Sequence, residues 1–114
     1  MTDCIFCKIV SGEVPGKIVF QDDLVTAFHD INPSAPVHIL VIPNKHITSI
    51  NDLTKDDESL MGHLLITVSK IAKDEGIAKN GYRLIVNTGP HANQVVPHLH
   101  VHILGGHNLI HPMG

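Results

Sequence analysis

The feature that most constrains this chain is a segment near its C-terminal end in which histidines alternate with apolar residues. From His98 to Leu104 the sequence reads HLHVHIL, so imidazoles occupy every second position up to His102 and aliphatic side chains lie between them. Side chains alternate between the two faces of a β-strand. The segment therefore predicts a strand whose apolar face packs on a core and whose other face presents a row of histidines.

A row of imidazoles is an unusual face for a strand that serves structure alone. A surface strand that happens to carry histidines is the competing interpretation, but strict alternation disfavours it, and protonated neighbours would repel one another. Neutral imidazoles bind metals and approach anionic substrates. His38 falls in a second predicted strand and is expected to face the same cleft.

The rest of the chain predicts a small mixed fold. A short helical turn is expected over residues 4–11, with Gly12 ending it, and a long helix is expected between Thr54 and Gly76, with Asp57 in a capping-box position. Apolar residues recur at helical spacing in that helix and predict its buried face: Leu60, Leu64, Leu65, Val68, Ile71 and Ala72. Apolar and β-branched runs predict further strands over residues 17–21, 24–29, 37–42 and 82–87.

This order of elements predicts an α+β fold with an antiparallel sheet of about five strands, one long helix and one short helix. The 114 residues suit a single domain, residues 1–114. An exposed apolar edge on so small a sheet predicts a homodimer. The net charge of −3, without a basic run, argues against nucleic acid as a partner. Without a membrane-length apolar run or a leader-like start, we expect no membrane partner and a cytoplasmic location.

Two cysteines, Cys4 and Cys7, form a C-x-x-C motif near the start of the chain. In a cytoplasmic protein such a pair is half of a zinc site or a redox pair. A thioredoxin-type redox pair should follow a strand, and this pair does not. Zinc requires four ligands, and histidines are plentiful here. The alternatives that stay open are a zinc site and two free buried thiols.

The alternating histidines resemble the signature of the histidine triad (HIT) superfamily. Other segments along nearly the whole chain resemble its Hint branch: residues 4–9, 27–31, 36–43, 45–46, 82–83, 86–87 and 105–112. The resemblance implies hydrolysis of the P–N bond in a purine nucleoside phosphoramidate, and a dimer in which the sheet continues across the two-fold axis. It also implies that Cys4, Cys7, His46 and His98 bind a structural zinc in some members, while hydrolysis itself needs no metal.

The resemblance also implies roles for the catalytic histidines. His100 is expected to form the nucleotidyl-histidine intermediate, which turns one difficult displacement into two easier ones. His102 is expected to handle protons, and His38 to line the phosphate site. His98 completes the triad, unless zinc takes it as a ligand.

The remaining expected contacts are with the nucleotide. Asp30 is expected at the ribose hydroxyls, and Asn87, Gln94 and the backbone of Val95 at the phosphate. Val95 stands where animal Hint proteins commonly have a serine, so the hydrogen bond near the leaving group is in question. An apolar slot for the base is expected from Ile5, Phe6, Ile9, Phe28, His29, Ile31 and Leu40.

Other functions remain open at this stage. The same histidine could serve a dinucleoside polyphosphate hydrolase or a nucleotidyl transferase. A nucleotide-binding regulatory dimer with incidental hydrolysis is a second alternative, and a metal-storage or sensor protein is a third.

Overall fold

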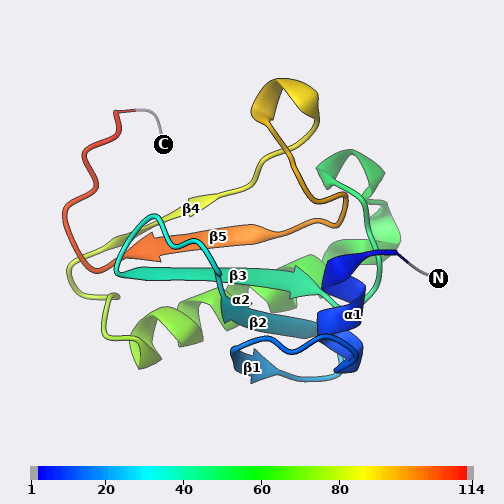
Figure 1. Cartoon of the computed structure of the whole chain (residues 1–114), viewed down its shortest axis with the longest axis horizontal. Coiled ribbons are helices and arrows are strands. Elements are labelled where there is room, and N and C mark those ends of the chain that lie inside the picture. The colour runs from blue at the N-terminus through cyan, green and yellow to red at the C-terminus, as the bar shows by residue number, and fades with distance from the viewer. Residues whose placement is uncertain (1–2, 113–114) are drawn as a thin grey trace.

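The computed structural model describes residues 3–112 and contains one five-stranded antiparallel sheet (Figure 1). The strands lie in the order β1-β2-β3-β5-β4, with β3 in the centre. Their bounds are Ile18–Gln21 for β1, Val25–His29 for β2, Val37–Pro43 for β3, Tyr82–Ile85 for β4 and Val101–Gly105 for β5. The helices are α1 (Ile5–Ser11) and α2 (Glu58–Asp74). The predicted α+β fold, with a long and a short helix, is confirmed.

Local chemistry explains where both helices begin and end. The Cys4 sulfur accepts a hydrogen bond from the Cys7 N–H at 3.4 Å and caps α1, and Gly12 ends it with a φ of +83°. Before α2, the Asp57 carboxylate accepts a hydrogen bond from the Thr54 N–H at 2.9 Å, as the capping box predicts. The first turn there is a 3-10 helix, so the α-helix itself begins at Glu58.

The sheet separates two apolar clusters. Helix α2 lies behind the sheet in Figure 1. It packs against odd-numbered side chains of the sheet, among them Ile39, Val41 and Ile103, which are fully buried. The even-numbered side chains of the same strands, such as Phe28 and Leu40, pack with α1 on the other face. Because Leu40 pairs with His102 across β3 and β5, the histidine row lies on this second face.

Three sequence predictions need correction. The strand expected over residues 98–104 begins only at Val101, because the Leu99 N–H donates to the carbonyl of Ile47, in the loop after β3, at 2.7 Å. The strand expected over residues 82–87 ends at Ile85. Leu65 was expected in the buried face of α2 but is 52% exposed, because it follows buried Leu64 by about 100° around the helix.

Candidate active site

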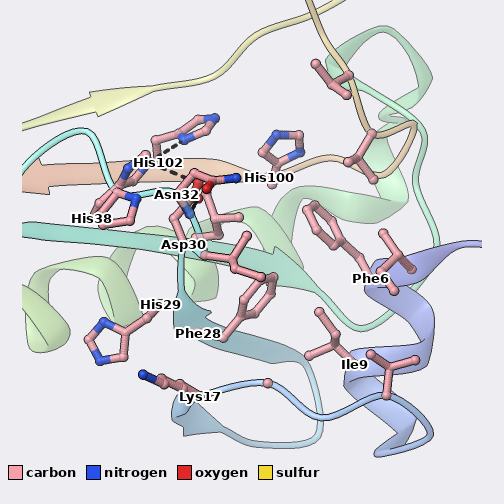
Figure 2. Close-up of a pocket in the computed structure, with 18 of the residues that line it drawn as sticks. Phe6, Ile9, Lys17, Phe28, His29, Asp30, Asn32, His38, His100 and His102 are labelled. Carbon is pink, nitrogen blue, oxygen red and sulfur yellow. Dashed lines mark hydrogen bonds and ion pairs between the residues drawn. The ribbon is translucent and has the colours of Figure 1, made fainter.

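A cavity of about 1220 Å³ opens on the face of the sheet opposite α2. Figure 2 shows His100 and His102 at one end of it and Ile9 and Phe28 toward the other. All seven residues expected in the apolar base slot line this cavity, as do His38, His100, His102, Asp30, Asn87 and Val95. A cavity of this size and lining, apolar with a few convergent polar groups, suits a small organic ligand such as a nucleotide.

His100 is held in one tautomer. Its Nδ1 lies 2.7 Å from the backbone oxygen of His98. Because a carbonyl oxygen can only accept, Nδ1 carries the proton and Nε2 keeps a free lone pair. The Phe6 ring packs edge-on against the imidazole with centroids 5.1 Å apart. The buried His100 ring therefore offers an oriented nucleophilic nitrogen.

A second chain of hydrogen bonds fixes His102. The Ser34 N–H donates to His38 Nδ1 at 2.9 Å, so His38 carries its proton on Nε2. That Nε2 lies 2.9 Å from His102 Nδ1 and 3.4 Å from Asp30 Oδ2. His102 Nδ1 thus accepts, and its own proton is on Nε2. Two neighbouring imidazoles therefore differ in what they offer: His100 a lone pair and His102 an N–H donor.

Burial favours the neutral forms of His102 and His38. Desolvation, followed by the charges of His100 and His38, lowers the pKa of His102 to about 4, while Asp30 acts in the opposite direction. Desolvation also lowers the pKa of His38, again partly offset by Asp30. A bound phosphate would favour the protonated forms because it adds negative charge beside the rings.

These shifts predict how stability depends on pH. Between pH 6.5 and pH 4 an unfolded chain protonates His102 but the folded chain does not, so lowering the pH through this window destabilises the fold. From pH 7 to pH 5 the loss from this residue is at most about 2 kcal/mol, because water still screens the half-buried ring. Urea unfolding at both pH values should show a smaller loss for His102→Asn than for wild type, with the exposed His91→Asn as control. Equal losses in all three proteins would contradict this assignment.

Gln94 is not where it was expected. Its side-chain nitrogen donates to the carbonyls of Thr48 at 2.8 Å and Val96 at 3.0 Å, and its oxygen accepts from the Gly89 N–H at 3.0 Å. The amide is therefore occupied by backbone groups of its own loop and of the loop after β3, and Gln94 does not line the cavity. His98 is also absent from the cavity wall, because its ring turns toward the cysteines.

Several cavity residues were not expected from the sequence: Val14, Pro15, Gly16, Lys17, Asn32, Pro33, Pro36, Asn93 and Val96. Most lie in loops, where no periodic pattern signals a position. The position of Lys17 could have been predicted, because antiparallel pairing of the consecutive strands expected over residues 17–21 and 24–29 places it beside His29. In the structure the His29 N–H donates to the Lys17 carbonyl at 3.1 Å. It is the single lysine or arginine among the residues lining the cavity.

Next to the cavity, Cys4, Cys7, His46 and His98 bring four ligand atoms within 4.8 Å of one another, so these side chains could hold a metal ion. The Nδ1 atom of His98 lies 3.3 Å from the Cys4 sulfur and 3.5 Å from the Cys7 sulfur, and His46 Nδ1 lies 3.2 Å from the Cys7 sulfur. His98 Nε2 donates to the Pro43 carbonyl at 2.8 Å, which leaves Nδ1 unprotonated toward the cysteines. Burial, and then the adjacent Cys4, raise the pKa of the Cys7 thiol to about 11, so a cation beside the pair would be needed to ionise it.

This chain is similar in sequence and in fold to known proteins. The profile of the HIT domain matches residues 11–109. The purine nucleoside phosphoramidase of Escherichia coli (strain K12) is 52% identical over 107 residues, which cover 94% of this chain and 90% of that protein. A HIT family hydrolase structure from Legionella pneumophila Philadelphia 1 superposes with a TM-score of 0.95 at 46% identity, and covers 98% of this chain and 100% of its own.

A histidine triad protein from Clostridium difficile gives a similar result, with a TM-score of 0.94 at 46% identity over 97% of this chain and 96% of its own. The sequence and the structure therefore resemble those of these proteins along nearly the whole length of the chain. On this evidence, the chain belongs to the HIT domain family.

Proposed function

We propose that this protein hydrolyses the P–N bond of purine nucleoside phosphoramidates through a nucleotidyl intermediate on His100. The observation that carries the proposal is the hydrogen bond from His100 Nδ1 to the His98 carbonyl, which leaves Nε2 free at the polar end of a nucleotide-sized cavity. The similarity to a protein named purine nucleoside phosphoramidase supports the same activity.

In the first step, His100 Nε2 attacks phosphorus, the P–N bond breaks, and the leaving nitrogen takes up a proton. The new N–P bond makes the ring cationic, and the His98 carbonyl stabilises that charge through Nδ1–H. In the second step, water displaces His100, which releases the nucleoside monophosphate and returns the proton. We assign this proton handling to His102. Its protonated form, which a bound phosphate favours by raising the pKa of the ring, gives the Nε2 proton to the leaving nitrogen, and the neutral ring then takes a proton from the attacking water.

The rest of the cavity would bind the nucleotide. Asp30 is 18% exposed and one of its oxygens already accepts from the Asn32 N–H at 2.8 Å, so the carboxylate is held in place to accept from ribose hydroxyls. Phe6, Phe28 and Leu40 are buried and form an apolar base slot. Because the Gln94 amide is occupied, we assign the phosphate donors to the imidazoles, Asn87 and the Val95 N–H.

The direct test is to mix the protein with an adenosine phosphoramidate, quench early and identify the modified residue by mass spectrometry. We expect AMP attached to His100, and steady-state release of AMP and free amine. Faster turnover of diadenosine polyphosphates would instead favour the dinucleoside polyphosphate hydrolase. Absence of both adduct and turnover, with nucleotide still bound, would favour a binding protein.

We further propose that the Cys4, Cys7, His46 and His98 cluster binds a structural zinc. Nitrogen and sulfur ligands at their usual distances from a tetrahedral zinc lie about 3.6 Å apart. The three nitrogen–sulfur distances of the cluster, 3.2 to 3.5 Å, are close to that value. The donor set of two thiols and two imidazoles is also typical of structural zinc.

The proposed dimer would use the free edge at β4. That strand lies at the edge of the sheet. Leu84 within it is 40% exposed, and Val86 just after it is 38% exposed. An open apolar edge favours pairing with a second copy, which would continue the sheet across a two-fold axis. Sedimentation should give twice the chain mass at micromolar concentration, and a monomer mass would contradict the proposal.

We also propose a cytoplasmic location. Cys4 and Cys7 form no disulfide, which suits a reducing compartment. Within residues 3–112, no helix combines the length and the apolar character that crossing a bilayer requires.

Val95 should influence the choice of leaving group. Its side chain is 86% exposed at the cavity rim and has no donor, so it cannot give a hydrogen bond to the departing amine. We expect Val95→Ser to change the ratio of kcat/KM between good and poor amine leaving groups by roughly tenfold, with little change in AMP affinity. Val95→Ala is the matched control. An unchanged ratio in the serine variant would argue against a role for this position.

A further inference from the structure

We infer that the Cys4, Cys7, His46 and His98 cluster, when it holds its metal, positions the nucleophile as well as stabilising the fold, with His98 as the positioning residue. The inference rests on the proposed function, because it concerns the histidine assigned there as nucleophile. The starting observation is that His98 belongs both to the cysteine–histidine cluster and to the active site. Its side chain joins the cysteines, and its backbone oxygen accepts the hydrogen bond from His100 at 2.7 Å.

The peptide unit between His98 and Leu99 carries this link. Its carbonyl orients His100, and its N–H donates to the Ile47 oxygen at 2.7 Å. The same peptide group therefore connects the nucleophile to the loop that follows β3. Because these residues lie before the start of β5, no strand ladder holds this peptide. Its orientation depends on the contacts between the two loop segments.

The cluster joins those same two segments. His46 precedes Ile47 in the chain, and His98 precedes Leu99, so a bound metal would cross-link residues 46–47 to residues 98–99 beside their hydrogen bond. His46 is exposed and contacts two members of the cluster: the Cys7 sulfur at 3.2 Å and the His98 ring at 4.9 Å between centroids. Loss of the metal would therefore release one side of the cross-link.

The Phe6 ring extends the connection to α1. It contacts the His98 ring at 5.9 Å and the His100 ring at 5.1 Å between centroids, both edge-on. Phe6 lies between Cys4 and Cys7 in the sequence, so a metal bound by the cysteines would also fix the helix that carries this ring. The cluster is thus connected to the His100 imidazole in two ways, through the packing of Phe6 and through the hydrogen bond to the His98 carbonyl.

The test compares zinc-loaded protein, protein stripped by a chelator and the variant His46→Asn, which removes an exposed ligand and opens no cavity. The exposed His91→Asn is the matched control. The first measurement is the imidazole ¹⁵N spectrum, with His100 assigned by its loss in His100→Asn. We expect a single Nδ1–H tautomer of His100 in loaded protein, and tautomer exchange in stripped protein and in His46→Asn. Returning Zn²⁺ should restore the stripped protein.

The second measurement is the single-turnover rate of nucleotidyl-His100 formation. We expect this rate to fall roughly tenfold or more when the metal is removed. Losses of this size are typical when a group that orients a functional side chain through a hydrogen bond is removed. AMP affinity, measured on the same samples, should change little, which separates lost positioning from unfolding. His91→Asn should match wild type in both measurements.

Three results would overturn the inference. They are an unchanged His100 tautomer in stripped protein, an unchanged adduct rate, and failure of the protein to bind Zn²⁺ at all. Loaded protein that forms no adduct would instead overturn the proposed function. The ¹⁵N spectrum would still decide whether the cluster orients His100, so the two failures are distinguishable.

Discussion

Replacing His100 with asparagine is expected to lower kcat for an adenosine phosphoramidate by roughly ten-thousand-fold or more, because removing the covalent nucleophile of a hydrolase can cost about a million-fold. The asparagine side chain can still donate toward the His98 carbonyl, but it has no nitrogen lone pair that can attack phosphorus. The variant should bind AMP about as well as wild type, because the base slot and Asp30 are untouched. Steady-state turnover, adduct formation and AMP affinity together check this expectation.

Two controls make that result specific. His91→Asn removes an exposed imidazole outside the cavity and should keep full activity. His102→Asn should reduce turnover but still allow an adduct, because it changes proton handling and leaves the nucleophile in place. Appreciable turnover by His100→Asn would contradict the covalent mechanism and favour direct attack by water.

Removing the metal is expected to have the second largest effect, on stability. A ligand that binds only the folded state at about 1,000 times its Kd adds about 4 kcal/mol. For a domain of this size that corresponds to a fall of about 10 °C or more in the midpoint of thermal unfolding when the metal is lost. A metal bound by Cys4 and Cys7 would link α1 to the loops that carry His46 and His98. Unfolding of the metal-free protein should therefore begin in that helix.

The measurement is a thermal melt of loaded protein, chelator-treated protein and Cys7→Ser, with metal content determined on each sample. Ser11→Ala, a substitution of an exposed residue at the other end of α1, is the control. Its midpoint of thermal unfolding should equal that of wild type. It removes only the hydroxyl bond to the Lys8 carbonyl, at 3.1 Å, and the one accepted from the Glu13 N–H. Equal midpoints for loaded and stripped protein would show that the cluster holds no stabilising metal.

Patterns with a clear period predicted the fold well. Alternation over residues 98–104 places His102 on one face and Ile103 on the other. The structure agrees, because His102 pairs with Leu40 of β3 on the cavity face and Ile103 packs in the core beneath α2. The same alternation predicted too long a strand, because the direction in which side chains point does not depend on whether the backbone pairs with a neighbouring strand. An extended chain alternates its side chains whether or not it has a neighbour, and the segment before Val101 bonds to a loop instead.

The site was less accessible to sequence reasoning wherever tertiary contacts decide. An amide such as that of Gln94 can bind a phosphate or hydrogen-bond to nearby backbone groups, and only the positions of the Thr48 and Val96 carbonyls select the second. Leu65 is apolar at helical spacing, yet the width of the face that α2 buries depends on the sheet beneath it. The tautomers of His38 and His100 follow from backbone groups that the sequence does not locate.

The division of the sheet into two faces has a consequence for how such proteins diversify. Odd-numbered residues such as Ala27, Ile39 and Ile103 pack with α2, and even-numbered ones such as Phe28, Leu40 and His102 face the cavity or α1. A substitution at Leu40 or Phe28 therefore remodels the recognition surface while Ile39 and Val41 keep the scaffold folded. Substrate preference can drift through neighbouring positions of one strand without each change threatening the fold, which lets a single backbone serve many related enzymes.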